Sequence, residues 1–159
     1  MTVDRVPRLL ATVLAACTAL VACTALVACS APAAKPAFAG YKWAIVSISH
    51  AGTTTPVPPA TKYASYLQFT PDGHFGANDP INYHSGSYQV TQGGFTTGSL
   101  MQTAMGYIGH DPVILLSMSA ISAFDDAARA MASVSGNTLT VTVGGYTLVA
   151  HRDGKQANF

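Results

Sequence analysis

Hydrophobic and polar residues alternate over much of the chain after residue 40, which predicts a fold rich in β-strands. Turn residues separate neighbouring runs, and Pro71-Asp72-Gly73, Gly93-Gly94 and Gly144-Gly145 each predict a tight hairpin. The Thr- and Pro-rich stretch from Gly52 to Pro59 predicts a loop. The expected strands cover residues 41–48, 66–70, 74–76, 86–90, 95–98, 138–143 and 146–150.

One segment between these strands has the pattern of a helix. From Asp111 to about residue 131 the chain has no turn residue after Pro112, and an Asp followed by a Pro is typical of an N-cap with Pro at the first helical position. We therefore expect one main helix at about 111–131, with a short strand at 131–134 and a turn at 135–137 after it. Apolar residues at steps of three or four positions would pack this helix on the sheet, namely Val113, Leu116, Ala120 and Phe124.

The first 28 residues have the pattern of an export signal. Arg5 and Arg8 precede an uncharged, mostly apolar run that extends from Leu9 to Ala28. The run ends in Leu-Val-Ala-Cys, which resembles the lipobox of bacterial lipoproteins, where the cysteine is acylated and becomes the new N-terminus. We expect a lipoprotein signal peptide at 1–28. The alternative is an uncleaved anchor, because a helix of about 20 residues also spans a membrane.

The residue that carries the lipid is expected to be Cys29. The sequence Cys-Thr-Ala-Leu-Val-Ala occurs at 17–22 and again at 23–28, so Cys23 is the alternative. Cys29 is favoured because the residues after it are rich in Pro, Ala and Ser, a composition typical of a tether. Two acyl chains would hold the protein on the extracytoplasmic face of the cell membrane. The expected parts after the signal are a tether at 29–40, a folded domain at 41–153 and a tail at 154–159.

Composition excludes several functional classes. The chain of 159 residues has 8 Lys and Arg against 7 Asp and Glu, and 9% of its residues are charged, so we expect no nucleic-acid binding. The sequence has no Glu, and its 3 Cys all lie at or before position 29. The mature domain therefore has no disulfide, no Cys-based metal site and no Glu that could act as a general base.

Several short motifs follow one another in the predicted domain. A strand with the single Trp opens it at 43–48, an apolar strand ends in Asp72-Gly73, and Gly136-Asn137 precedes the final hairpin. In this order, over about 41–152, the chain resembles the META domain family, whose best-known members are HslJ-type bacterial lipoproteins. The resemblance implies an α+β fold, mostly antiparallel β, with a compact META/HslJ-like sheet or partly closed barrel and one main helix packed on it.

Two further motifs of that family fall on identifiable residues. The form Gly-Cys-Asn-x-x-x-Gly-x-Tyr is matched by Asn82, Gly86 and Tyr88, and the form Thr-x-Met-x-Cys is matched by Thr103 and Met105. We expect structural roles here, since Asn can hold a turn, Gly permits close approach and Tyr joins an apolar ring to a polar tip.

The chain departs from these motifs at both cysteines. Ile81 and Tyr107 stand in the two positions, so any cross-link or thiol chemistry that the family's cysteines provide is absent. If this region contacts a ligand instead, Tyr83, His84 and Tyr107 are the candidate contacts.

Histidine is the side chain that could supply a neutral-pH base or a nitrogen ligand, and the chain has 5 of them. None has the two-His spacing of a helical metal site. His74 and His84 follow or precede Asp72 and Asp79 closely and could meet across a hairpin, but surface or loop histidines are the commoner outcome. We expect no metal and no cofactor.

The adjacent Asp125 and Asp126 do not form a catalytic pair. Neighbouring residues of a helix cannot both face one site, so we expect these carboxylates on a solvated face, within reach of Arg129.

The sequence therefore favours a non-enzymatic, lipid-anchored envelope protein that binds or stabilises another envelope component, and the resemblance adds a possible link to stress. The alternative is a small-ligand-binding lipoprotein with a pocket between helix and sheet, lined by exposed tyrosines among Tyr63, Tyr66, Tyr83 and Tyr107. A hydrolase built around His74, His84 and Asp72 ranks third.

Overall fold

A computed structural model describes residues 35–125 and 128–154 of the chain. The predicted signal peptide and both candidate lipidation sites, Cys23 and Cys29, lie outside the described residues, as does Asp126. The elements are β1 (Tyr41–His50), β2 (Thr53–Pro56), a 3-10 turn (Thr61–Tyr63), β3 (Tyr66–Phe69), β4 (His74–Asn78), β5 (Tyr83–Thr91), β6 (Gly94–Thr97), β7 (Met101–Gln102), α1 (Pro112–Ser122), β8 (Arg129–Ser135), β9 (Thr138–Val143) and β10 (Tyr146–Arg152).

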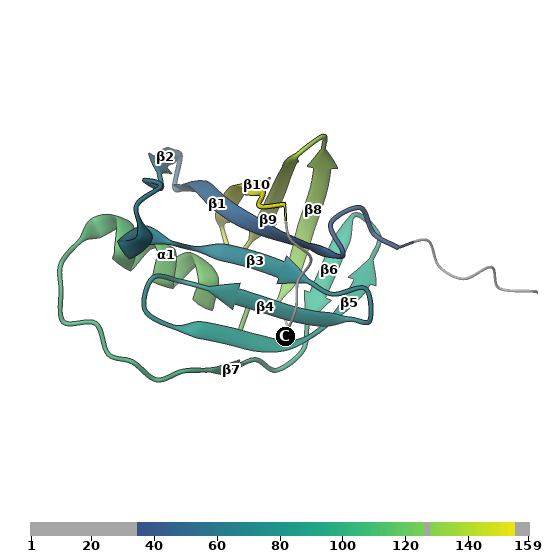
Figure 1. Cartoon of the computed structure of the whole chain (residues 1–159), viewed down its shortest axis with the longest axis horizontal. Helices are drawn as coiled ribbons and strands as arrows, with labels where there is room; N and C mark the ends of the chain where they lie inside the picture. Colours follow the sequence, from purple (N-terminus) through teal and green to yellow (C-terminus); the bar gives the residue numbers. More distant parts are fainter. Residues whose placement is uncertain (1–34, 126–127, 155–159) are drawn as a thin grey trace, which may run out of the picture. The chain divides into compact units, whose positions relative to one another are not determined.

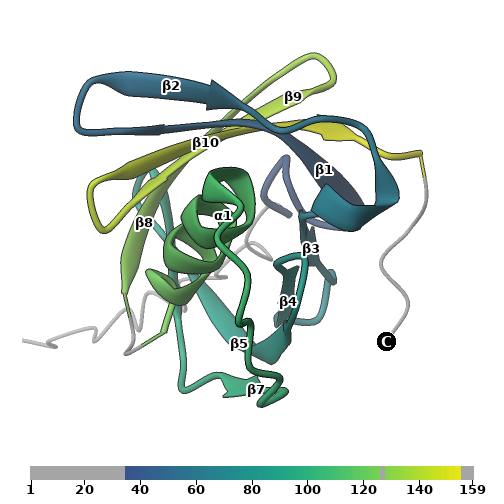
Figure 2. The same cartoon turned by 90° about the vertical axis from the view of Figure 1, so that its left-hand side faces the viewer.

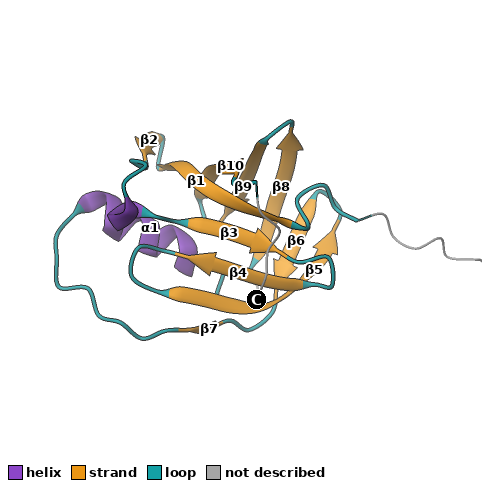
Figure 3. Ribbon diagram, in the orientation of Figure 1, coloured by secondary structure: helices purple, strands orange, loops and turns teal. Residues whose placement is uncertain are grey.

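Eight of the strands close into an antiparallel barrel (Figures 1 and 3). Hydrogen-bonded neighbours follow the order β10-β9-β8-β6-β5-β4-β3-β1, and β1 pairs with β10 along its length to complete the ring. Outside the ring, β2 pairs with β1 and β7 pairs with β5. The α+β, mostly antiparallel fold is confirmed in its barrel form. Closure leaves no unpaired edge within the ring.

The hairpins fall at the predicted turns. Between β9 and β10, Gly144 and Gly145 have φ angles of 53° and 83°. Side chains with a Cβ rarely adopt such angles, which explains why the turn uses two glycines.

The first part of the stretch predicted as a loop at 52–59 is the short strand β2. Ala51 and Gly52 both have positive φ, 48° and 80°, and turn the chain so that three consecutive Thr residues pair with the end of β1. The prediction of a loop was wrong at these positions because the turn uses Ala, which seldom adopts positive φ, and because Pro residues follow it closely.

The helix starts at the predicted residue and ends earlier than predicted. The Asp111 carboxylate accepts a hydrogen bond from the Val113 N–H at 3.0 Å, and Pro112 occupies the first turn. The helix ends at Ser122 rather than near residue 131, because Arg129–Ser135 forms β8, which pairs with both β6 and β9 and is needed to close the ring.

The predicted apolar stripe packs on the core: Ala120 and Phe124 are buried in it, and Val113 and Leu116 contact it. Ile114, Ser117, Ala120 and Ile121 are buried, whereas Val113 and Leu116 are half-buried. The helix contains no charged residue. The buried face is wider than the predicted stripe, because it also includes Ile114, Ser117 and Ile121.

The barrel interior is filled with aromatic and aliphatic side chains, and α1 covers one mouth of the barrel (Figure 2). Phe124, just after the helix, stacks on Phe95 with a centroid distance of 6.1 Å. Ahead of β1, the Phe38 ring packs on Phe69 with a centroid distance of 4.8 Å, and the Phe38 carbonyl accepts a hydrogen bond from Trp43 Nε1 at 2.9 Å. Phe38 belongs to the stretch predicted as a tether, yet it lies in the core.

Candidate functional site

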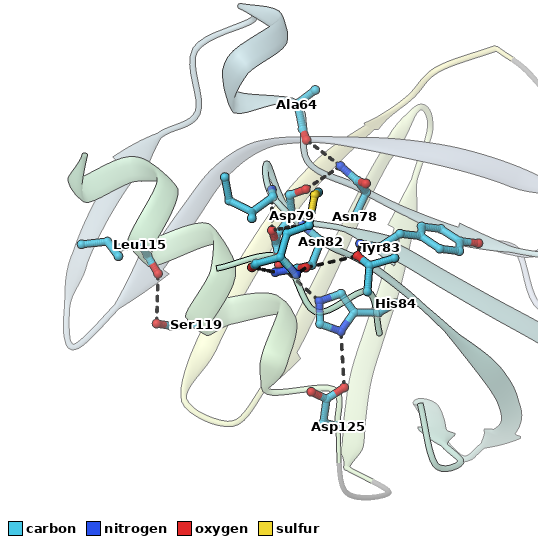
Figure 4. A network of polar contacts seen from close by, with 12 residues as sticks. Ala64, Asn78, Asp79, Asn82, Tyr83, His84, Leu115, Ser119 and Asp125 are labelled. Atoms are coloured by element: carbon cyan, nitrogen blue, oxygen red, sulfur yellow. Dashed lines mark hydrogen bonds and ion pairs between the residues drawn. The ribbon is translucent and has the colours of Figure 1, made fainter. Parts of the chain in front are cut away.

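A histidine is buried between two carboxylates inside the mouth that α1 covers (Figure 4). His84 Nε2 lies 3.2 Å from Asp79 Oδ2, at hydrogen-bond distance, and His84 Nδ1 lies 3.6 Å from Asp125 Oδ1, at ion-pair distance. The side chains of His84 and Asp79 are only 1% and 2% exposed, while that of Asp125 is 30% exposed. We call these three residues the Asp-His-Asp clamp.

Local sequence places each member of the clamp. Asp79 opens the connection between β4 and β5, where its Oδ1 accepts hydrogen bonds from the N–H groups of Ile81 and Asn82, both at 2.7 Å. This is the turn chemistry that Asp favours. His84 lies on β5 opposite Ala77, with both residues buried. Asp125 follows α1 directly, so the clamp connects the hairpin to the end of the helix.

The two carboxylates favour the charged form of the imidazole. Burial alone would lower the pKa of His84, but the Asp79 and Asp125 carboxylates outweigh it and raise this pKa above its ordinary value of 6.5. Burial would raise the pKa of Asp79, but hydrogen bonds from His84, Asn82 and Ile81 outweigh it and lower this pKa below 3.8. The clamp therefore favours an imidazolium beside a carboxylate at mildly acidic pH.

The free energy of unfolding should fall at both ends of the pH range, at high pH because of His84 and at low pH because of Asp79. Because folding raises the pKa of His84, its contribution is complete below about pH 6.5 and is lost as the pH rises through the folded pKa. Folding lowers the pKa of Asp79, so its contribution is present above about pH 4 and is lost as the pH falls through the folded pKa. We expect the free energy of unfolding to be highest between these two values.

Urea unfolding followed by the fluorescence of the single Trp, repeated across the pH range, measures this profile. A His84→Asn variant should lose the decline on the alkaline side. An unchanged alkaline decline in that variant would contradict the assignment.

The family-motif residues hold the segment after β6 against the barrel. The Asn82 side-chain carbonyl accepts hydrogen bonds from the Met105 N–H at 2.8 Å and the Thr103 hydroxyl at 3.1 Å, and its amide donates to the Met105 carbonyl at 3.2 Å. At Gly86 a Cβ would lie 2.8 Å from the Ser99 carbonyl oxygen, so glycine permits this segment to run close to β5.

Tyr88 makes its contacts at the other end of β5. Its ring packs edge-on against Phe69 at 5.4 Å, and its hydroxyl donates to the Thr70 carbonyl at 2.8 Å. The structural roles expected for the motif residues remain predictions, which variants can test.

Replacing Asn82 with Ala should destabilise the domain by about 1–3 kcal/mol, because the buried Asn82 side chain makes three hydrogen bonds that the variant loses, two with the backbone of Met105 and one with the Thr103 hydroxyl. Hydrogen exchange should show faster exchange of the Met105 amide. Gln89→Ala, on the exposed side of β5, serves as the control and should change stability by less than about 0.5 kcal/mol. Equal effects of the two variants would contradict a tethering role.

The predicted ligand contacts are not gathered around one opening. His84 is buried in the clamp. Tyr83, its neighbour on β5, is half-buried, and its hydroxyl accepts a hydrogen bond from Gln68 Nε2 at 3.0 Å. Tyr107 is half-buried, and its hydroxyl accepts from the Asp111 N–H at 3.3 Å. Tyr83 and His84 are successive residues of a strand and so project to opposite faces of the sheet.

The structure differs from the sequence interpretation at two places among the titratable residues. His74 pairs with Ser87 in the β4–β5 ladder, whereas His84 pairs with Ala77, so the hairpin does not bring the two histidines together. His74 is exposed and lies 3.8 Å from Asp72, while His84 is buried. Asp125 lies beyond the helix and contacts His84 instead of forming part of a solvated helical face.

This geometry does not fit the hydrolase hypothesis, because His84 and Asp79 lie where no substrate can touch them in this conformation. Within residues 35–125 and 128–154, no group of three or more His, Cys, Asp or Glu side chains is arranged to hold a metal ion. The helices in the same ranges include none with the length and hydrophobicity of a membrane span.

The sequence matches the META domain over residues 36–155. Among solved structures, the chain is similar to an NMR structure of a protein from Burkholderia xenovorans, with a TM-score of 0.58 and 20% identity over 74% of this chain and 85% of that one. A second NMR structure is similar with a TM-score of 0.52 and 18% identity, over 70% and 88% of the two chains. At this level of identity, the two structures show a similar fold and nothing about function. No curated protein matches the chain.

Proposed function

Because this chain belongs to the META domain family, we propose that it is a non-enzymatic, lipid-anchored envelope protein whose barrel binds or stabilises another envelope component by surface contact. The META domain is not a known family of enzymes. The expected link to stress is a further part of this proposal. The titratable groups brought together inside the barrel form the buried clamp, which suits a structural role better than catalysis.

The observation that carries the proposal is an exposed apolar segment that the fold holds in place. Between Met101 and Leu115 the most exposed large apolar side chain is Ile108, at 97%. Residues 99–124 contain a single charged side chain, Asp111, which is bound by Tyr63 and Lys62. Single exposed apolar residues are normal on a protein surface, but several in one stretch with a single charge indicate a contact surface. The exposed apolar side chains of this segment are those of Met101, Met105, Ile108 and Leu115.

The anchor is tested by membrane fractionation and by the mass of the mature N-terminus. We expect a diacylated N-terminal Cys29 in the membrane fraction, and loss of the lipid in Cys29→Ser but not in Cys23→Ser. A mature N-terminus at Cys23 would move the site, and an intact Met1 or a protein found in the cytosol would refute the anchor.

The contact surface is tested by a photo-crosslinking amino acid placed at position 108 in cells. We expect a discrete covalent adduct with one envelope component. The matched control carries the same group at Gly136, an exposed turn residue away from the apolar segment, and should give no such adduct. Identical adducts from both positions, or none from position 108, would count against this surface.

The alternative small-ligand function was expected to use a pocket between helix and sheet. The structure does contain a groove that Tyr63 and Tyr66 line, but it lies elsewhere, against β1 and β3, and no residue of α1 lines it. The groove shares no lining residue with the apolar segment.

A further inference from the structure

The groove lies where β1 changes partner. Residues 41–44 of β1 pair with β3, and residues 47–50 pair with β2, so these two neighbours diverge around Ile45 and Val46. The register between β1 and β10 also shifts between Ile45 and Ser47, as in a β-bulge. Bulges commonly redirect strands beside binding sites. Here the divergence leaves a hollow of about 350 Å³ beneath the connection from β2 to β3.

The walls of the groove are fixed by the fold. The Val57 N–H donates to the Val46 carbonyl, and the Ile45 N–H donates to the Ser65 carbonyl, both at 2.9 Å, so both ends of the connection are tied to β1. Pro58 and Pro59 lie between these ties and restrict the backbone. A groove that exists before binding lowers the entropic cost of binding.

Two opposite charges line this groove. Lys42 and Asp153 are neighbours across the end of the β1–β10 ladder, where the Asp153 N–H donates to the Lys42 carbonyl at 2.9 Å. In the described part of the chain their side chains do not form an ion pair with each other. The Lys42 ammonium lies 3.8 Å from the centroid of the Tyr66 ring instead. Both charges therefore remain available to a ligand.

We propose that this groove binds a short zwitterionic peptide, with its carboxylate on Lys42, its ammonium on Asp153 and its small side chains against the apolar wall of Ala44, Val57 and Pro58. The volume lies near the lower end of the range for small-molecule sites, about 300–1,000 Å³, which suits two or three small residues. A simple anion or cation would use one of the two charges, and a neutral sugar would use neither. The binding is separate from the surface contact proposed above, and either can fail alone.

The test is a titration of the full chain in detergent micelles with Ala-Ala-Ala, followed by ¹H–¹⁵N NMR. We expect saturable shifts at the amides of Lys42, Ser65 and Tyr66. Lys42→Met and Asp153→Asn should each weaken binding by about tenfold or more. The matched control for the lysine is Lys62→Met, since Lys62 also lies over a tyrosine ring, that of Tyr63, but does not line the groove. It should leave the affinity unchanged.

Two capped forms of the probe decide the role of charge. N-acetylated and C-amidated Ala-Ala-Ala should each bind at least about tenfold more weakly than the free peptide. Equal affinity for the capped and free peptides would overturn the zwitterion assignment, as would equal shifts from a neutral trisaccharide. The absence of shifts at about 10 mM peptide, well above the Kd of a weak specific site, would overturn the site itself.

Discussion

Replacing His84 with Ala should lower the free energy of unfolding by about 3–5 kcal/mol, the usual cost of removing one partner from a buried ion pair. Asp79 is 2% exposed and would lose its imidazole partner inside the barrel, while Asp125 would lose its contact with β5. The loss should be largest at mildly acidic pH, where the imidazolium is complete. Urea denaturation followed by Trp43 fluorescence measures it, because this side chain is fully buried.

His74→Ala is the matched control for this variant. The His74 side chain is 65% exposed and lies beside the exposed Asp72, so its removal should change stability by no more than about 0.5 kcal/mol. A similar loss in both variants would show that burial between carboxylates does not distinguish His84. A double variant, His84→Leu with Asp79→Asn, should recover part of the loss, because it leaves no unpaired charge at position 79, while the Asn side-chain oxygen can still accept from the N–H groups of Ile81 and Asn82.

Replacing Gly94 with Ala should destabilise the barrel by at least about 3 kcal/mol. A Cβ at position 94 would overlap the carbonyl group of Ala130 on the facing strand β8. Backbone cannot give way as a flexible side chain can, so β6 and β8 would have to separate at the point where β8 joins the ring. The measurement is thermal unfolding by circular dichroism.

Gly106→Ala is the control for this steric effect, since among the described residues, its two chain neighbours aside, no atom lies within 4 Å of a Cβ built at that position. It should change stability by about 0.5 kcal/mol or less. If Gly94→Ala unfolds at the same temperature as the wild type, the close approach of β6 and β8 is not a requirement of the fold.

Strands and turns were readable from the sequence because their signals are local. The alternation over β9 and β10, the paired glycines between them and the Asp111-Pro112 start of α1 all depend on residues near one another in the chain. The family resemblance added the order of the elements. Closure of the ring depends on β1 meeting β10, a pairing that joins residues about 100 positions apart and that no local pattern shows.

The clamp was missed for a related reason. Asp79 and His84 were noted as near one another in sequence, but Asp125 was assigned to a solvated helical face because the helix was extended too far. Ending α1 at Ser122 places Asp125 at the barrel mouth, where it meets β5. When only the tertiary fold brings a carboxylate close to a histidine, no spacing in the sequence predicts the contact. The exposure of Ile108 could not be predicted from the sequence either, because an isolated apolar residue in a loop can be buried or exposed.

If the proposed lipid anchor holds the domain by its N-terminus, the packing of Phe38 has a mechanical consequence. Tension on the chain ahead of Pro36 would meet the packing of Phe38 on Phe69 and the Trp43 hydrogen bond before it reached β1. β1 is bonded on both sides, to β10 and to β3 or β2, so a pull along its axis loads these bonds in shear and many must break together. Under the proposed anchoring, force from the N-terminal side would therefore act on a strand that is hard to separate from the barrel.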